Sequence, residues 1–271
     1  MQTGHFGRRE GFKPGDEAPS VAPMTPLFDL SGRRALITGS TRGIGFALAR
    51  GLAAHGAEVI LNGRDSSRLA QACETLSATG QPFDVTDENA VRDGVSAVEQ
   101  DGPIDILVNN AGMQYRAPLE EYPTEIWEKI LRTNVTSAFL MARAVAPAMI
   151  ARKSGKIINI ASIQSELARP SIAPYTATKG AIRNLTRGMA TDWARHGLQV
   201  NAIAPGYFKT PLNQALIDDP DFTAWLEGRT PAGRWGDIDE LVGLAVLLAG
   251  PGSSFINGQT IYVDGGMSAS V

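Results

Sequence analysis

Short apolar runs alternate with amphipathic segments along the chain from Arg34 onward. A continuous apolar run is typical of a strand buried on both faces of a sheet, whereas apolar residues three or four positions apart indicate a helix. The apolar runs predict strands at residues 35–38, 57–61, 104–108, 156–160, 198–203 and 260–263, and a short third strand is expected at residues 81–83. The periodic segments predict helices at residues 43–55, 66–77, 87–98, 125–149 (one or two), 173–195, 211–227 (one or two, short) and 237–248.

Strands that alternate with helices in this way predict a parallel sheet with both faces covered. We therefore expect an α/β fold in which residues 27–271 form a single-domain, Rossmann-type, doubly wound parallel sheet of about seven strands with helices on both faces. Residues 1–26 contain glycine, proline and charge without apolar periodicity, which predicts a flexible N-terminal extension. The longest departure from the alternation, residues 207–236, follows the carboxyl end of a predicted strand and is a candidate substrate lid.

The composition narrows the class of protein. Hydrophobic residues make up 43% of the chain and charged residues 20%, and the net charge is −3. There is no basic excess that would favour nucleic acid, and the longest apolar run, residues 241–250, is about half of the roughly 20 residues that a membrane span needs. We therefore expect neither a nucleic-acid partner nor a membrane partner. Cys73 is the single cysteine, so no internal disulfide can form, and we expect a reducing, cytoplasmic setting. The three histidines lack metal-ligand spacing, so no metal site is predicted.

A glycine-rich turn follows the first predicted strand and opens the first predicted helix. Glycines permit a tight turn and a close approach of the backbone to a diphosphate, while the helix N-terminus offers free N–H groups. The spacing is Gly-x3-Gly-x-Gly rather than the familiar Gly-x-Gly-x2-Gly, but the strand–turn–helix context is the one that a dinucleotide site requires. The predicted cofactor-binding residues of this turn are Gly39, Ser40, Thr41, Arg42, Gly43, Ile44 and Gly45.

The end of the second predicted strand bears on the choice of cofactor. It reads Asn62-Gly63-Arg64, without the carboxylate that would bond the ribose 2′-hydroxyl of NAD. A guanidinium forks onto a phosphate, so Arg64, with Arg42 nearby, predicts NADP over NAD. Asp65 would favour NAD if the register differed by one residue. The adenosine half of the cofactor is expected to contact residues that follow the next two strands, namely Asp84, Val85, Asn110, Ala111 and Gly112.

Four polar residues follow in an order that suggests one reaction centre. Tyr175 and Lys179 are one turn apart on a predicted helix, Ser162 follows the predicted strand at 156–160, and Asn134 lies upstream. Each feature is weak alone, but with the glycine turn, Asn109-Asn110-Ala111-Gly112 and Pro205-Gly206 the chain, from about residue 27 to its end, resembles the short-chain dehydrogenase/reductase family.

This resemblance implies a role for each of the four residues. Tyr175 would be the acid/base, Lys179 would bond the nicotinamide ribose, Ser162 would hydrogen-bond the substrate oxygen, and Asn134 would support a water relay. A free tyrosine has a pKa of about 10, which the Lys179 ammonium and the nicotinamide charge would lower. The resemblance also implies a homotetramer. It places four further residues at the nicotinamide, namely Pro205, Gly206, Phe208 and Thr210.

The substrate is suggested by three other segments. Residues 112–120, 165–170 and 230–236 resemble the gluconate 5-dehydrogenase group within the family. This implies hydride transfer between NADP(H) and a polyhydroxy acid, foremost D-gluconate and 5-keto-D-gluconate. Arg116 is expected to pair with the carboxylate of such a substrate, and Gln164 to bond a hydroxyl. Glu166 and Arg169 are further candidates for the pocket. For Arg116, Glu166 and Arg169 alike, the alternative is a surface or intersubunit ion pair.

Two alternatives remain at this stage. One is a 3-oxoacyl-[acyl-carrier-protein] reductase, whose acidic carrier would favour a basic patch at the mouth of the site. The other is a non-catalytic nucleotide-sensing regulator. Such a regulator would be expected to lack one of the four polar residues, and all four are present.

Overall fold

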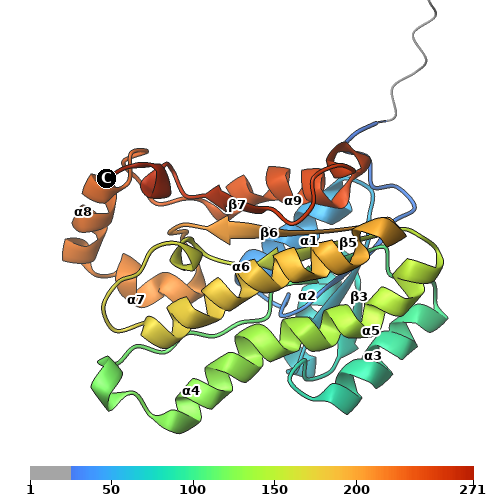
Figure 1. Cartoon of the computed structure of the whole chain (residues 1–271), viewed down its shortest axis with the longest axis horizontal. Helices are drawn as coiled ribbons and strands as arrows, with labels where there is room; N and C mark the ends of the chain where they lie inside the picture. Colours follow the sequence, from blue (N-terminus) through green and yellow to red (C-terminus); the bar gives the residue numbers. More distant parts are fainter. Residues whose placement is uncertain (1–25) are drawn as a thin grey trace, which may run out of the picture.

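The computed structural model describes residues 26–271, so the predicted N-terminal extension lies outside the described residues except for its last residue. Its strands form one parallel sheet of seven in the order β3-β2-β1-β4-β5-β6-β7 (Figure 1). The strands are β1 (Arg34–Ile37), β2 (Glu58–Gly63), β3 (Thr79–Pro82), β4 (Ile106–Asn109), β5 (Gly155–Ile160), β6 (Leu198–Pro205) and β7 (Thr260–Val263). The predicted fold class, a doubly wound α/β sheet, is confirmed.

Helices connect the strands and cover both faces of the sheet. They are α1 (Gly43–Ala54), α2 (Ser66–Leu76), α3 (Glu88–Gln100), α4 (Thr124–Leu131), α5 (Ser137–Ala151), α6 (Ala173–Trp193), α7 (Gln214–Ile217), α8 (Pro220–Arg229) and α9 (Val242–Ala249). The starts of α2 and α3 are set by the aspartates that the sequence places there. Asp65 accepts a hydrogen bond from the Arg68 N–H, and Asp87 accepts one from the Ala90 N–H.

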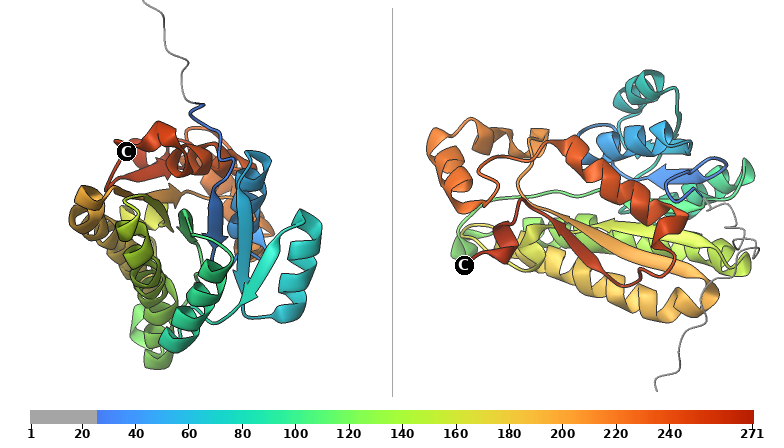
Figure 2. Two further views of the ribbon diagram at one scale, coloured as in Figure 1. Left: turned by 90° about the vertical axis from the view of Figure 1, so that its right-hand side faces the viewer. Right: turned by 90° about the horizontal axis from the view of Figure 1, so that it is seen from above.

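The core is divided by the sheet because successive strand residues point to opposite faces. Ile106 and Val108 of β4 pack in a cluster with α1, α2 and α9, whereas Leu107 packs in a cluster with α3, α5 and α6. Figure 2 shows these helices as layers on either side of the strands. Both faces of the central strands are therefore apolar, which explains the continuous apolar runs in the sequence.

The third strand differs from its predicted position. The strand expected at 81–83 lies at Thr79–Pro82, since only two residues connect α2 to it and Ser77 adopts a left-handed conformation (φ 51°) to make the turn. The segment 125–149, predicted as one or two helices, is two helices, α4 and α5, joined by a π-helical turn at Arg132–Thr136. Such turns are rare and often occur at functional sites.

By length and composition, Thr124–Ala151 is the one helix within residues 26–271 that could cross a membrane. Its mean hydropathy is 1.3 and half of its apolar window is buried inside the fold. Its second part, α5, packs against β4 and β5 and between α3 and α6. The apolar residues of α5 thus pack against the sheet and the neighbouring helices.

The candidate lid, residues 207–236, follows β6, and its two ends pair with each other. The Lys209 N–H donates to the Gly236 carbonyl at 3.0 Å, and the Gly236 N–H donates to the Tyr207 carbonyl at 2.9 Å. Between these joined ends the segment carries α7 and α8. Figure 1 shows both helices beyond the carboxyl end of the sheet, with the C-terminus beside α8.

Candidate active site

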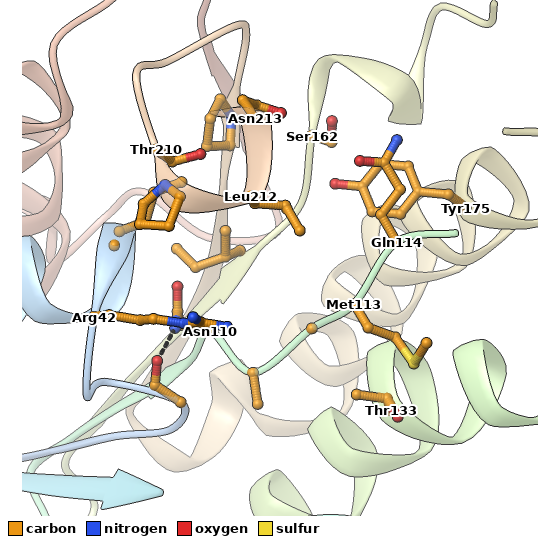
Figure 3. A pocket seen from close by; sticks show the side chains of 18 of the residues that line it. Arg42, Asn110, Met113, Gln114, Thr133, Ser162, Tyr175, Thr210, Leu212 and Asn213 are labelled. Carbon is orange, nitrogen blue, oxygen red and sulfur yellow. Dashed lines mark hydrogen bonds between the residues drawn. The ribbon is translucent and has the colours of Figure 1, made fainter. Parts of the chain in front are cut away.

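A cavity of about 630 Å³ crosses the carboxyl edge of the sheet. The strand order reverses between β1 and β4, and ligands bind at such switch points. Figure 3 shows Arg42 and Asn110 on one side of the cavity and Ser162, Gln114 and Tyr175 on the other. The predicted site residues that line it are Gly39, Thr41, Arg42, Gly43, Ile44, Arg64, Asp84, Val85, Asn110, Ala111, Gly112, Arg116, Ser162, Gln164, Tyr175, Lys179, Pro205, Gly206, Phe208 and Thr210.

The remaining predicted residues, Ser40, Gly45 and Asn134, lie behind the cavity wall. Ser40 is fully buried, donates to the Ile37 carbonyl at 2.8 Å and accepts from the Asn62 N–H at 3.0 Å. Its side chain therefore joins the glycine turn to β2 and does not face the cavity. A Cβ on Gly45 would lie 2.4 Å from the Asn110 amide nitrogen, so this position requires glycine for packing.

The glycine turn leaves donors available at the start of α1. Gly39 and Gly43 have φ values of +61° and +59°, which favour glycine. In the part of the chain that the structure describes, no side chain caps the N-terminus of α1. Its first N–H groups and the positive end of the helix dipole are thus open to an anion at the cavity wall.

Asn110 and Thr38 fix the glycine turn to the end of β4. The Asn110 amide donates to the Thr38 and Gly39 carbonyls, both at 2.9 Å. The Thr38 hydroxyl accepts from the N–H groups of Asn110 and Ala111 at 3.0 and 3.1 Å. The two walls of this end of the cavity are therefore a single hydrogen-bonded unit.

The register at the end of β2 is the one that places Arg64 directly after the strand. Asp65, the alternative ribose ligand, caps α2 and forms an ion pair with Arg68 at 3.3 Å. Arg64 lies 3.3 Å from Asp84, and both side chains are well exposed, so this pair holds Arg64 only weakly. Arg42 is exposed at the same end of the cavity.

Tyr175 and Ser162 meet at the other end of the cavity. Burial raises the pKa of Tyr175 to about 12, although a hydrogen bond with Ser162 acts in the opposite direction. In the protein without a cofactor, desolvation of the phenolate is the largest effect on this pKa. The lowering expected from Lys179 together with the nicotinamide charge stays a prediction.

Lys179 is buried beside the tyrosine. Its ammonium nitrogen lies 5.6 Å from the centre of the Tyr175 ring and donates to the Ile160 carbonyl at 2.7 Å. Burial lowers the pKa of Lys179 to about 8. An ammonium has three donors, so two remain for other groups at this wall.

Asn134 lies in the π-helical turn and links the loop after β4 to α6. Its amide oxygen accepts from the Met113 N–H at 2.8 Å, and its amide nitrogen donates to the Met113 carbonyl at 2.9 Å and to the Thr178 hydroxyl at 3.1 Å. Both N–H donors of the amide and one acceptor position of its oxygen thus hold the loop against the helix that carries Tyr175. The water-relay role of Asn134 stays a prediction.

Arg116 reaches the cavity from the loop after β4, and Arg169 reaches it from the loop before α6. Gln164 is buried beside them, and its amide oxygen has no hydrogen-bond partner within residues 26–271. Glu166, by contrast, pairs with Arg183 and accepts from the Tyr262 hydroxyl at 3.3 Å, outside the cavity. Of the two alternatives, a place in the pocket or a surface ion pair, Arg169 thus takes the first and Glu166 takes the second.

Comparison with known proteins agrees with this arrangement. A family model described as enoyl-(acyl carrier protein) reductase matches residues 39–268. The gluconate 5-dehydrogenase of Gluconobacter oxydans (strain 621H) is 59% identical, with 90% of this chain and 98% of that protein covered. The chain belongs to the short-chain dehydrogenase/reductase family.

Two further relatives support the assignment. The 5-keto-D-gluconate 5-reductase of Escherichia coli (strain K12) is 50% identical over 92% of this chain and 100% of that protein. A gluconate 5-dehydrogenase from Burkholderia cenocepacia J2315, solved in complex with NADP and tartrate, has 55% identity and a TM-score of 0.88, covering 90% of this chain and 98% of that one. The protein is accordingly an oxidoreductase of this family that acts on CH–OH groups.

Sequence reasoning missed several residues of this dehydrogenase/reductase site. Gln114, Tyr207 and Leu212 line the cavity but were not among the predicted site residues. Gln114 lies in the segment 112–120, and Tyr207 and Leu212 lie in the candidate lid, residues 207–236. They occur in the loops after β4 and β6, where only the topology indicates a ligand. Further cavity-lining residues outside the predictions are Asn62, Gly63, Arg68, Phe83, Thr86, Met113, Thr133, Ile160, Ala161, Ile163, Ile172, Pro211, Asn213 and Leu216.

Proposed function

We propose that the protein interconverts D-gluconate and 5-keto-D-gluconate with NADP(H), using Tyr175 as the acid/base. One observation carries the proposal. A single cavity joins the Tyr175–Ser162 pair to a wall with the Arg116 guanidinium, so a reacting hydroxyl and a remote carboxylate can be bound together. The substrates named for the relatives in Gluconobacter and Escherichia have both groups.

The residues of the cofactor end fit a dinucleotide with a 2′-phosphate. The uncapped start of α1 would bind the diphosphate, and Arg42 and Arg64 would bind the 2′-phosphate. Asp84 and Val85 would contact the adenine. When bound, the oxidised nicotinamide accepts a hydride from the carbinol carbon. That the Burkholderia relative was solved with NADP supports this choice.

The side chains at the other end manage the proton. Tyr175 takes the proton of the substrate hydroxyl during oxidation and returns it during reduction, while Ser162 hydrogen-bonds the same oxygen. Lys179 holds positive charge beside the phenol and has donors left for the ribose. Because the cavity wall is buried here, these charges act at low effective dielectric.

Substrate orientation follows from the wall opposite the cofactor. Arg116 would pair with the carboxylate, and the free oxygen of Gln164 would accept from a hydroxyl. An acyl thioester has no carboxylate for Arg116, which disfavours the carrier-protein alternative.

A spectrophotometric assay of NADP and NAD with gluconate, other sugar acids, polyols and an acetoacetyl thioester tests the proposal. We expect gluconate oxidation with NADP to be the fastest reaction. Brisk thioester reduction beside no gluconate oxidation would overturn the substrate assignment. The expected homotetramer is a separate proposal, checked by light scattering of the purified protein, and a cytoplasmic location by cell fractionation.

A further inference from the structure

Two guanidiniums face the substrate end of the cavity without an acid between them. Neither Arg116 nor Arg169 forms an ion pair with a carboxylate of residues 26–271. In the same part of the chain, the buried Nε of Arg116 and the buried Nε and Nη2 of Arg169 have no hydrogen-bond partner. Buried donors without acceptors are costly, so this wall is suited to an anion.

The two cations also act on one another. Burial lowers the pKa of Arg116, and the positive charge of Arg169 lowers it further. Asp65 and Asp84 are the carboxylates among the described residues that line the cavity, and both lie at its adenosine end. A bound anion would relieve the repulsion between the guanidiniums.

Aromatic residues of the lid hold Arg169 in place. Its guanidinium carbon lies 5.5 Å from the centre of the Phe222 ring in α8. Burial raises the pKa of Tyr207, and the nearby positive charge of Arg169 acts in the opposite direction. Tyr207 and Phe222 pack edge to face with their centres 5.6 Å apart. A guanidinium placed on an aromatic face keeps its edge available for a forked contact with two oxygens.

We propose that Arg169 is a second ligand of the substrate carboxylate, opposite Arg116, and that Phe222 is a positioning residue for Arg169. The inference rests on the proposed function, since it specifies how that substrate is selected. It predicts selection for hydroxy acids whose carboxylate is remote from the reacting CH–OH group, and discrimination against neutral polyols. Because the contact is the same before and during the reaction, it lowers KM and leaves kcat largely unchanged.

Steady-state kinetics with gluconate and NADP provide the first test. Arg169→Ala should raise the KM for gluconate about 10- to 100-fold with kcat within about threefold, because a charge-assisted contact is lost. Arg169→Lys should recover part of the loss, since it retains the charge but not the fork. Phe222→Leu should raise KM about two- to fivefold. Arg187→Ala, which removes an exposed arginine of α6, should change nothing. An unchanged KM in Arg169→Ala would overturn the inference.

Calorimetry of the NADP-loaded Tyr175→Phe protein, with and without the Arg169→Ala substitution, separates this inference from the proposed function, because this background should bind gluconate without oxidising it. Gluconate and tartrate are the probes, and D-glucitol is the neutral control. Arg169→Ala should weaken binding of both anions at least about tenfold and leave D-glucitol unchanged. Weakened anion binding without gluconate oxidation by the wild type would refute the proposed substrate and support the anion site. Gluconate oxidation with KM and anion affinity unchanged in Arg169→Ala would refute the site alone.

The NADP affinity of each variant reports whether its cavity is intact. If Arg169→Ala loses NADP binding, its cavity is disturbed, and Arg169→Lys is then the variant that tests the role of Arg169 in gluconate binding. That variant should bind NADP normally and gluconate more weakly than the wild type, and normal gluconate binding would refute the role of Arg169.

Discussion

At the adenosine end, the cavity floor is backbone and short side chains that hydrogen-bond to one another, with the exposed Arg42 and Arg64 at the rim. The substrate end is bounded by long side chains whose unused donors are buried. Thr38, Ser40 and Asn110 bond back to the chain at the first end. Arg116 and Arg169 have buried nitrogens without partners among the described residues at the second. The first end is thus preorganised by the protein, and the second is completed by its ligand.

This difference follows the chain's connectivity. The adenosine end is built from turns that leave β1, β2 and β4, whose positions the sheet dictates. The substrate end is built from the loops after β4 and β5 and from a lid with its own aromatic cluster, Tyr207, Phe222, Trp225 and Trp235. A change at the first end should therefore disturb stability and cofactor binding together, while one at the second should affect the substrate alone.

Tyr175 lies where the two ends meet, and removing its hydroxyl gives the largest expected effect. Tyr175→Phe should lower kcat about 10²- to 10⁴-fold, because the phenol is the group that exchanges the proton of the substrate oxygen in the proposed mechanism. Affinities for NADP and gluconate should change little, since the ring and both ends of the cavity remain. Stopped-flow turnover and fluorescence titration measure the two quantities. A residual rate above a tenth of the wild-type rate would contradict the assignment.

The second largest expected effect is a difference in pH dependence between the rate of oxidation and the rate of reduction. Burial raises the pKa of Tyr175 to about 12, above its usual value, so at neutral pH the phenol form predominates. Oxidation needs the phenolate and should rise with pH, up to about tenfold per unit well below the pKa, while reduction needs the phenol and should not rise.

Lys179 modifies this profile. Burial lowers the pKa of Lys179 to about 8, so its ammonium assists the phenolate chiefly below that pH. Lys179→Met should therefore slow oxidation more at pH 7 than at pH 10. Initial rates in both directions from pH 6 to 10 check this, and an equal loss at all pH values would argue that Lys179 serves only the ribose.

Sequence patterns predicted the fold because both faces of the sheet are apolar. Ile106, Leu107 and Val108 in one run, and Ile157 and Ile158 in the other, are consecutive apolar residues that pack on opposite faces of the sheet, which favoured a covered parallel sheet. The third strand was misplaced because Thr79–Pro82 is short and largely polar, so its pairing with β2 is set by the sheet and not by its own pattern.

The site was predictable where its residues are close in sequence. The glycine turn and the Tyr175–Lys179 pair are contiguous motifs, so the family resemblance could assign a role to each of them once they were found together. Arg169 and Phe222 are 53 residues apart (222 − 169) and meet only through the fold of the lid. The sequence also could not show that the Ser40 side chain points into the fold. A serine in a glycine turn can hydrogen-bond either a ligand or a buried backbone carbonyl, and here it bonds the Ile37 carbonyl.

Gly45→Ala tests whether the adenosine end is one unit. The added Cβ would lie 2.4 Å from the Asn110 amide nitrogen, so the amide must move and lose its bonds to the glycine turn. We expect a loss of about 1–3 kcal/mol in the free energy of unfolding and at least about tenfold weaker NADP binding. Gly243→Ala in α9, where a Cβ meets nothing within 4 Å, is the matched control. Thermal unfolding and NADP titration measure both. Weaker NADP binding at unchanged stability would argue against a single unit.

Arg64→Asp has a smaller effect, because the side chain is exposed and its ion pair with Asp84 is weak. Losing the guanidinium should weaken NADP binding and leave NAD binding little changed, shifting the NADP/NAD preference by about tenfold. Stability and the KM for gluconate should stay constant, since no packed group moves. Arg92→Asp, an exposed arginine of α3 outside the cavity, controls for the change in net charge. An unchanged preference would assign the 2′-phosphate to Arg42 and leave Arg64 as a solvated residue at the rim. A simultaneous rise in the KM for gluconate would show that the adenosine end and the substrate end are coupled. It would contradict the expectation that a change at one end leaves the other unaffected.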